Sequence, residues 1–282
     1  MQDKETFDTV ITSHRGWFDV NLRELFRYRD LIFMFVKRNF IANYKQTILG
    51  PAWAIIQPLL TTVVFTIVFG RIAHLPTDGV PPFLFYMCGN VAWGYFSGCL
   101  NQTATTFTAN AAVMGKVYFP RLVMPISSVF SQLIQFGIQF LFLVCFMVYF
   151  SFINHTPYLT WSILYLPLLL LQMALLGLGC GVIISSLTTK YRDLHHLVGF
   201  GIQLWMYATP VVYTIDMIPA KWRRLYLCNP MAIVIESFRD MFFGTSVVTW
   251  SNIAISWGIT LAIALLGILL FNRVEKTFMD TV

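Results

Sequence analysis

The strongest constraint on this chain is a set of long apolar stretches that contain no charged residue and no histidine. Each approaches or exceeds the roughly 20 residues that cross the hydrocarbon core of a bilayer as a helix. The six stretches are residues 48–69, 82–106, 125–150, 163–187, 197–212 and 253–271. Only 11% of the 282 residues are charged, against about 25% in soluble domains. The sequence therefore predicts an all-α membrane protein with six transmembrane helices.

The distribution of lysine and arginine orients these helices. With the N-terminus inside, 14 of the 19 basic residues fall in predicted cytoplasmic parts, eight of them before Thr47. Cytoplasmic loops carry the excess of positive charge in membrane proteins. We therefore expect a cytoplasmic N-terminal part (1–47), a six-span membrane domain (48–272) and a cytoplasmic C-terminal tail (273–282).

The N-terminal part predicts an amphipathic helix rather than a seventh span. Asn21 and Glu24 have the spacing of a capping box. Apolar residues recur at helical spacing and charged residues fall on another face: Leu22, Phe26, Phe33, Val36 and Phe40 against Arg23, Arg27, Asp30 and Lys37. A basic amphipathic helix of this kind lies in the membrane interface.

The loop before the last span predicts a re-entrant hairpin over residues 220–244. Asn229 suits a helix N-cap, Pro230 a first turn, and Gly244 a C-terminal stop. The 14 residues between these signals give about 21 Å of helix, which is shorter than the bilayer core of about 30 Å. We expect two short helices that enter the outer leaflet and return. A true span here would place Arg273 and Lys276 outside, which the charge distribution disfavours.

The motifs that carry enzymatic chemistry are missing from the sequence. It contains no glycine-rich phosphate loop and no HExxH, CxxC or GxSxG motif. The predicted spans lack the ionisable residues on which ion-coupled carriers and proton relays depend. If the protein moves a substrate, its driving energy is expected to enter from a partner.

Four ordered motifs resemble one family, the permease subunits of polysaccharide-exporting ABC transporters. They are YKQTILGPAWAIIQP (44–58), KVYFPRLVMPISS (116–128), YRDLHHLVGFGIQLWMYATPVVY (191–213) and NPMAIVIESFRDMFFG (229–244). The likeness covers nearly the whole chain and is nearest to the O-antigen exporters. Capsule and teichoic-acid exporters are relatives.

The resemblance implies a homodimer in the bacterial inner membrane with two separate ATP-binding subunits. It implies a polysaccharide substrate linked to a polyprenyl diphosphate, which passes through a channel at the permease interface. This chain would then hold no cofactor and bind no nucleic acid, while ATP and Mg²⁺ would be used on the partner. Three alternatives stay open: export of capsule or teichoic acid, a polyprenyl-lipid-processing membrane enzyme, and a passive assembly scaffold.

The first and fifth spans flank the channel in the relatives. Pro58 should kink the first span, and Gln57 beside it should face a wet lumen or bond a neighbouring helix. Aromatic rings can stack on sugars, and these spans supply candidates. With Gln57, the candidate channel residues are Trp53, Phe65, Phe69, Trp205, Tyr207 and Tyr213. For any one of these rings, lipid contact is the alternative.

Two further candidate sites lie on the cytoplasmic side, and the resemblance implies the first of them. A short helix over residues 110–117 would couple to the ATPase, with Val113, Met114, Lys116, Tyr118 and Arg121 as candidate contacts. Positive charge near the N-terminal helix would bind lipid headgroups or the diphosphate through Arg27, Lys37, Arg38, Tyr44 and Lys45, unless it serves only as general anchoring.

The hairpin is the candidate outer gate, with Pro230, Glu236, Arg239 and Asp240 as its residues. Glu236 and Arg239 are three residues apart and can pair on one helical face. Charges at membrane depth are costly unless paired or wet, so this face should line protein or a water-filled vestibule. In the alternative, a plain interfacial hairpin, the ions would reach the lipid headgroups.

Overall fold

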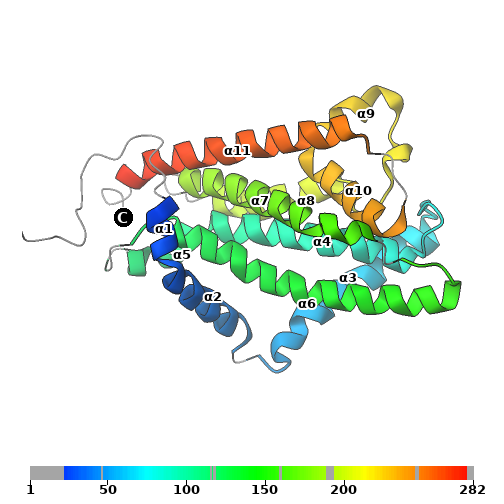
Figure 1. The fold of residues 1–282 in the computed structure, drawn as a ribbon, viewed down its shortest axis with the longest axis horizontal. Coiled ribbons are helices and arrows are strands. Elements are labelled where there is room, and N and C mark those ends of the chain that lie inside the picture. The colour runs from blue at the N-terminus through cyan, green and yellow to red at the C-terminus, as the bar shows by residue number, and fades with distance from the viewer. Residues whose placement is uncertain are drawn as a thin grey trace, which may run out of the picture.

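A computed structural model describes residues 22–45, 47–114, 116, 119–158, 161–188, 194–244 and 248–277. Every regular element within these ranges is helical, and they contain no strand. The prediction of an all-α protein is confirmed. Figure 1 shows the long helices running side by side along the long axis of the molecule.

Four helical segments are long and apolar enough to cross a membrane. The first, Gly50–Ile72, combines a 3-10 turn, helix α3 (Trp53–Phe65) and a π-helical turn. The second is α6 (Val123–Asn154), and the third joins a 3-10 turn to α7 (Leu166–Thr188). The fourth lies within α11 (Trp250–Thr277). Helix α3 contains Pro58 and continues through it.

Helix α4 (Pro82–Ala104) occupies the centre of the bundle. It packs against α3, α6, α7, α8 and α10, and 15 of its 23 residues are buried. At about 1.5 Å per residue it is long enough to span, although its polar residues make it less apolar than the four helices above. Among its polar residues, Asn90 and Gln102 are half-buried and Asn101 is exposed.

Helix α8 (Leu194–Tyr207) differs from the predicted fifth span, 197–212. It begins three residues earlier and ends five residues earlier, so that its 14 residues give about 21 Å of helix. Pro210 explains the early end, because proline cannot donate the next helical hydrogen bond and disfavours helical geometry at the preceding residue. The chain turns at this point, where the Val211 amide donates to the Thr209 carbonyl over 2.7 Å.

The N-terminal segment forms two helices, α1 (Leu22–Arg27) and α2 (Arg29–Tyr44), where one was predicted. Ile32, Phe35 and Val36 of α2 are buried against the protein. Phe26 and Phe33, from the predicted apolar face, are 70% and 69% exposed. The segment thus has one apolar side on the protein and another facing outward. The capping box lies outside what the structure describes, because Asn21 and the Glu24 side chain are not placed.

Two groups of short elements occupy opposite ends of the bundle (Figure 1). Helices α1 and α5 (Thr106–Met114) lie near the C-terminal end of α11. At the other end lie α9 (Ala220–Leu227) and the connection from α3 to α4. A short helix was predicted over residues 110–117, and α5 begins four residues before that range.

The two helices predicted for residues 220–244 are α9 and α10 (Pro230–Phe243). The Asn229 side chain accepts a hydrogen bond from the Met231 amide over 3.1 Å, which is the expected N-cap. Gly244 ends α10 in the left-handed region, with φ of 65°. The predicted limits of α10 are confirmed at both ends.

Helices α7 and α11 approach closely through glycine. A Cβ atom on Gly267 would lie 2.8 Å from the Gly179 carbonyl oxygen, and one on Gly179 would lie 2.9 Å from the Ala264 Cα. Small residues at helix crossings in membranes allow such close backbone packing. This crossing holds α11 against the part of the bundle that surrounds α4.

We expect Gly267→Ala to destabilise the protein by about 1–3 kcal/mol, because the added methyl group meets backbone that cannot move aside locally. Gly258→Ala on the same helix is the matched control, since nothing lies within 4 Å of its added Cβ. That control should be neutral or slightly stabilising, as alanine favours helix. Thermal unfolding in detergent measures both variants. Equal melting temperatures for the two would contradict the close crossing.

Candidate functional site

A cavity of about 490 Å³ lies among α3, α4, α6 and α8 and contains an unusual concentration of amide side chains. We call it the amide cavity. Seven of its lining residues carry a side-chain amide: Gln57, Asn90, Asn101, Gln102, Gln132, Gln135 and Gln139. Pro58, Thr61, Trp93, Gly94, Ser97, Gly98, Gly199 and Ile202 complete the lining.

Helical periodicity gathers these residues. On α4 the cavity residues from Asn90 to Asn101 recur at intervals of three or four, so they lie along one side of the helix. On α6 the three glutamines follow the same rule, at 132, 135 and 139. Gln102 lies 12 positions after Asn90, or about 18 Å along the helix axis. The cavity therefore runs along much of one face of α4.

Most of the side-chain amides that line the cavity have no hydrogen-bond partner within the described part of the protein. Asn90 Nδ2 donates to the Pro58 carbonyl over 3.1 Å, which ties α4 to α3 beside the proline. In the ranges that the structure describes, the other six amides form no hydrogen bond. An amide without a partner is costly away from water. These groups therefore require water or a polar ligand in the cavity.

Two glycines of α4 make room for the glutamines of α6. A Cβ atom on Gly98 would lie 2.4 Å from Gln132 Oε1, and one on Gly94 would lie 3.6 Å from Gln139 Oε1. A larger residue at position 98 would displace the Gln132 side chain into the cavity. The glycines thus set the width of the cavity along α4.

The lining favours uncharged, hydroxyl-rich ligands. Each amide offers two donors and one acceptor oxygen without a net charge, and a sugar hydroxyl both donates and accepts. The Trp93 ring adds an apolar surface at the same site. Among the residues that the structure places, no group of three or more His, Cys, Asp or Glu side chains suits a metal ion.

The structure separates the candidate channel residues. Gln57 lines the cavity. Trp205 lies in the interior instead: its indole N–H donates to Asn229 Oδ1 over 3.1 Å, and its ring packs edge-on against Phe96 at 5.0 Å. Tyr213 donates to the Tyr207 carbonyl over 2.8 Å, and its hydroxyl pairs with that of Tyr226.

The remaining candidate rings also lie outside the cavity lining. Phe65 and Phe69 are half-buried and pack edge-on at 5.5 Å, while Trp53 and Tyr207 are exposed. Sequence reasoning missed six of the seven amides because it searched the spans for ionisable and aromatic residues. The spacing of Gln132, Gln135 and Gln139 in an apolar helix was a signal that could have revealed them.

The candidate gate residues form a buried ion pair. Arg239 Nη1 lies 3.2 Å from Glu236 Oε1, and their side chains are 1% and 6% exposed. The predicted pairing is confirmed, and the surrounding protein covers both side chains. Pro230 is buried on the same helix, whereas half-buried Asp240 lines a second cavity of about 330 Å³ between α7, α10 and α11.

Arg239 joins three segments of the chain. Its guanidinium donates to the Val211 carbonyl over 2.6 Å and to the Tyr213 carbonyl over 3.3 Å, and it stacks on the Phe85 ring at 3.7 Å. Gly89 of α4 permits this approach, because a Cβ there would lie 2.7 Å from the Val211 oxygen. Helix α10 is thereby fixed to α4 and to the turn after α8.

The candidate coupling residues lie at the end of the bundle that carries α1 and α5. Val113 packs against an apolar cluster to which α2, α6, α7 and α11 contribute, and Lys116 is exposed. Arg121 is half-buried. Tyr118 and the Met114 side chain lie outside the described residues.

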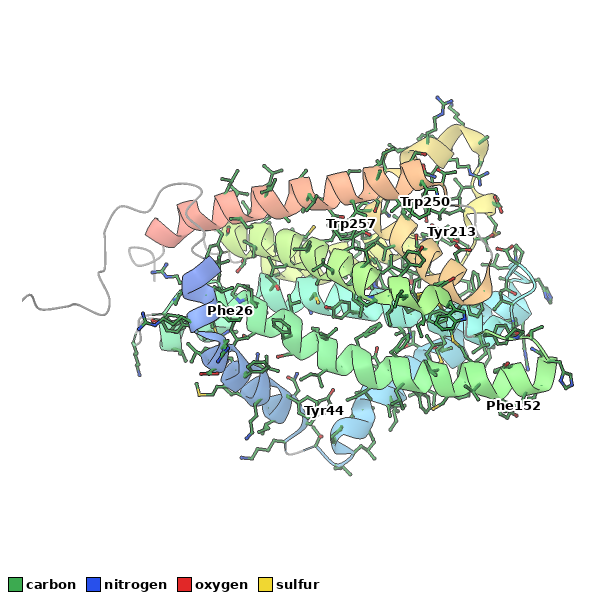
Figure 2. The ribbon with its side chains drawn as sticks, viewed as in Figure 1. Phe26, Tyr44, Phe152, Tyr213, Trp250 and Trp257 are labelled. Carbon is green, nitrogen blue, oxygen red and sulfur yellow. The ribbon has the colours of Figure 1, made fainter. Side chains whose placement is uncertain are left out.

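The candidate headgroup residues do not share one role. Arg38 donates to Asn110 Oδ1 over 2.8 Å, which links α2 to α5. Arg27, Lys37 and Lys45 are exposed. Tyr44 packs edge-on against Phe40 at 4.9 Å, and burial raises the pKa of its phenol. Figure 2 shows Tyr44 at the end of α2 next to α3 and Phe26 at the opposite end of the α1–α2 pair.

We expect a cysteine at position 135 to react with a hydrophilic thiol reagent in membranes, because its side chain points into a wet cavity. The control is Ile134→Cys, which places a thiol on the exposed outer side of the same helix. Lipid should shield that thiol and slow its labelling about tenfold or more, since thiolate formation needs a polar environment. Cys145 and Cys228 are exposed, so serine must replace them in both variants. Equal labelling rates would contradict a water-filled amide cavity.

Comparison with known proteins places the chain in a family. The family model described as ABC-2 type transporter matches residues 30–243. The O-antigen export system permease protein RfbA of Klebsiella pneumoniae is 30% identical, over 92% of this chain and 96% of its own length. The protein of the same name from Myxococcus xanthus is 30% identical over 79% of this chain and 84% of its own length.

A more distant relative is the polysialic acid transport protein KpsM of Escherichia coli. It is 22% identical over 83% of this chain and 89% of its own length. The family model spans all of α3 to α10 and therefore includes α4 and α6, which carry six of the seven cavity amides. This chain belongs to the ABC-2 type transporter family of membrane permeases.

Proposed function

We propose that this chain is the channel-forming permease of an ATP-driven exporter that moves a lipid-linked polysaccharide, an O-antigen, across the bacterial inner membrane. The amide cavity is the observation that carries this proposal. A polymer of sugars needs hydrogen-bond partners for its hydroxyl groups throughout the membrane, where neither lipid nor bulk water supplies them. The seven amides and the Trp93 ring supply such partners.

The relatives support an O-antigen over a capsule polymer. The O-antigen export permeases from Klebsiella and Myxococcus are 30% identical to this chain, while the polysialic acid transport protein is 22% identical. A polyprenyl diphosphate carrier for the polymer follows from the resemblance of the sequence motifs. The exposed basic residues near the end of α2 are suited to its phosphates.

A second copy of the chain completes the channel in this proposal. Only 11% of the most apolar stretch of Gly50–Ile72 is buried within the chain, so most of this helix is available to a partner subunit. Gln57 and Thr61 lie on the same helix and line the amide cavity. A partner seated along α3 would enclose the cavity and present the same amides from the other side.

The proposed topology has six spans, with both termini in the cytoplasm. Helix α4 spans at the centre, and α8 spans together with the turn that follows it. Helices α9 and α10 form the re-entrant hairpin and gate the outer end. The buried Glu236–Arg239 pair supports this, because it lets a charged helix lie at membrane depth while Arg239 ties it to the turn after α8.

ATP hydrolysis takes place on a separate subunit in this proposal, with Mg²⁺ bound there. Helix α5 is the contact that transmits its movement. The hydrogen bond from Arg38 to Asn110 supports this role, since it links α5 to α2 at the end of the bundle where both lie. Movement of α5 would therefore reach α2 directly, and through α4 it would reach the cavity.

We expect Gly98→Phe to block export, because its ring must occupy the amide cavity beside Gln132. The matched control is Gly137→Phe on α6, where nothing lies within 4 Å of an added Cβ. Surface polysaccharide on cells measures export, and co-purification of the ATP-binding subunit verifies assembly. Normal export by an assembled Gly98→Phe complex would refute the cavity as the transport path.

A further inference from the structure

We infer that the polysaccharide moved by this protein is electrically neutral along its repeating units. The inference rests on the proposed function and narrows its substrate class. It follows from the composition of the amide cavity together with the positions of the charges that the chain does carry.

The amide cavity contains no ionisable side chain. None of its 15 lining residues is Asp, Glu, Lys, Arg or His. An anionic repeating unit would leave water for a site that offers no cation, and every unit of the chain would meet that cost in turn. Pores for anions place arginine or lysine along the path instead. A path lined by amides suits a polymer whose units carry hydroxyl groups alone.

A second copy of the chain would not change this conclusion. In a homodimer the partner contributes the same residues, so the joint cavity would hold twice the amides and still no charge. Each amide has two N–H donors and a carbonyl oxygen with two lone pairs. The amides without a partner therefore favour neither an anionic nor a cationic ligand. The balance matches a sugar hydroxyl, which uses both functions.

No charged residue that the structure describes lines the cavity, and the charged residues of α2 and α10 have other surroundings. Arg239 is neutralised by Glu236 at 3.2 Å inside α10. Lys37 and Lys45 are exposed on and beside α2, and Lys45 follows Tyr44 directly before the first spanning segment. The anionic diphosphate of the carrier thus finds its cations at the membrane surface, while the sugar units meet only neutral groups.

The first experiment identifies the polymer and measures its charge. Deleting the gene in the source bacterium should remove one surface polysaccharide, and restoring the gene should return it. The polymer, freed from its lipid anchor, should pass through an anion exchanger and a cation exchanger without binding. Retention on either column would overturn neutrality and leave the exporter function standing. No loss of any surface polymer would contradict the exporter function itself, and with it the inference.

The second experiment connects neutrality to the cavity through charge of opposite sign. Gln135→Lys and Gln135→Glu should reduce export to levels within about twofold of each other, because a neutral polymer does not distinguish the sign. Gln135→Met is the uncharged control for lost hydrogen bonding. The same pair at Thr61, on α3, repeats the test if the α6 variants do not assemble.

The two charged variants also separate the possible failures. Export at least about tenfold higher with lysine than with glutamate would indicate an anionic polymer and overturn the inference, since tenfold corresponds to about 1.4 kcal/mol. The reverse order would indicate a cationic polymer and overturn it equally. Unchanged export in all variants and in Gly98→Phe would remove the cavity from the path, and the inference would fail with it.

Discussion

A helix that carries amide groups along one side cannot face lipid, and this constraint organises the whole bundle. Helix α4 holds Asn90, Asn101 and Gln102 within its 23 residues. Lipid offers these amides no hydrogen bond, so turning them toward lipid would cost free energy. Helices α3, α6, α7, α8 and α10 pack around α4, and α6 adds its glutamines to the same polar side. The amide cavity is the direct result.

The buried ion pair imposes a second constraint, on the contacts among α4, α10 and the turn after α8. Removing one partner of such a pair would leave an uncompensated charge in the protein, at a cost of about 3–5 kcal/mol. Arg239 avoids that cost through Glu236 and two backbone carbonyls. The carbonyls belong to the turn created by Pro210, so the early end of α8 and the position of α10 depend on each other.

Local signals in the sequence were sufficient where one helix decides its own structure. Asn229 and Gly244 predicted both ends of α10, and the spacing of Glu236 and Arg239 predicted their pairing. The charge-free apolar stretches predicted an all-helical protein. These features depend on residues within a few positions of one another, which is the range over which helix caps and i,i+3 pairs act.

Features that depend on tertiary contacts were not predictable in the same way. Trp205 resembles a channel residue in sequence, yet its indole bonds Asn229, 24 positions away. The buried side of α2 depends on a contact between Phe35 and Phe119, whose ring centroids lie 5.9 Å apart. Phe119 precedes α6 and lies 84 positions after Phe35. The amide cavity is lined by four helices. Within a single segment, the periodic glutamines of α6 are the sequence signal that indicates it.

The central claim is that the exported polymer passes along the amides of α4 and α6. It can be measured by placing a photoreactive phenylalanine analogue at Gln135 or at Phe130, an exposed position on the same helix, and stalling the complex during export. The account predicts that the polymer is crosslinked from position 135 and not from position 130. Crosslinking from position 130 alone, or from neither position in a complex shown to hold polymer, would contradict it.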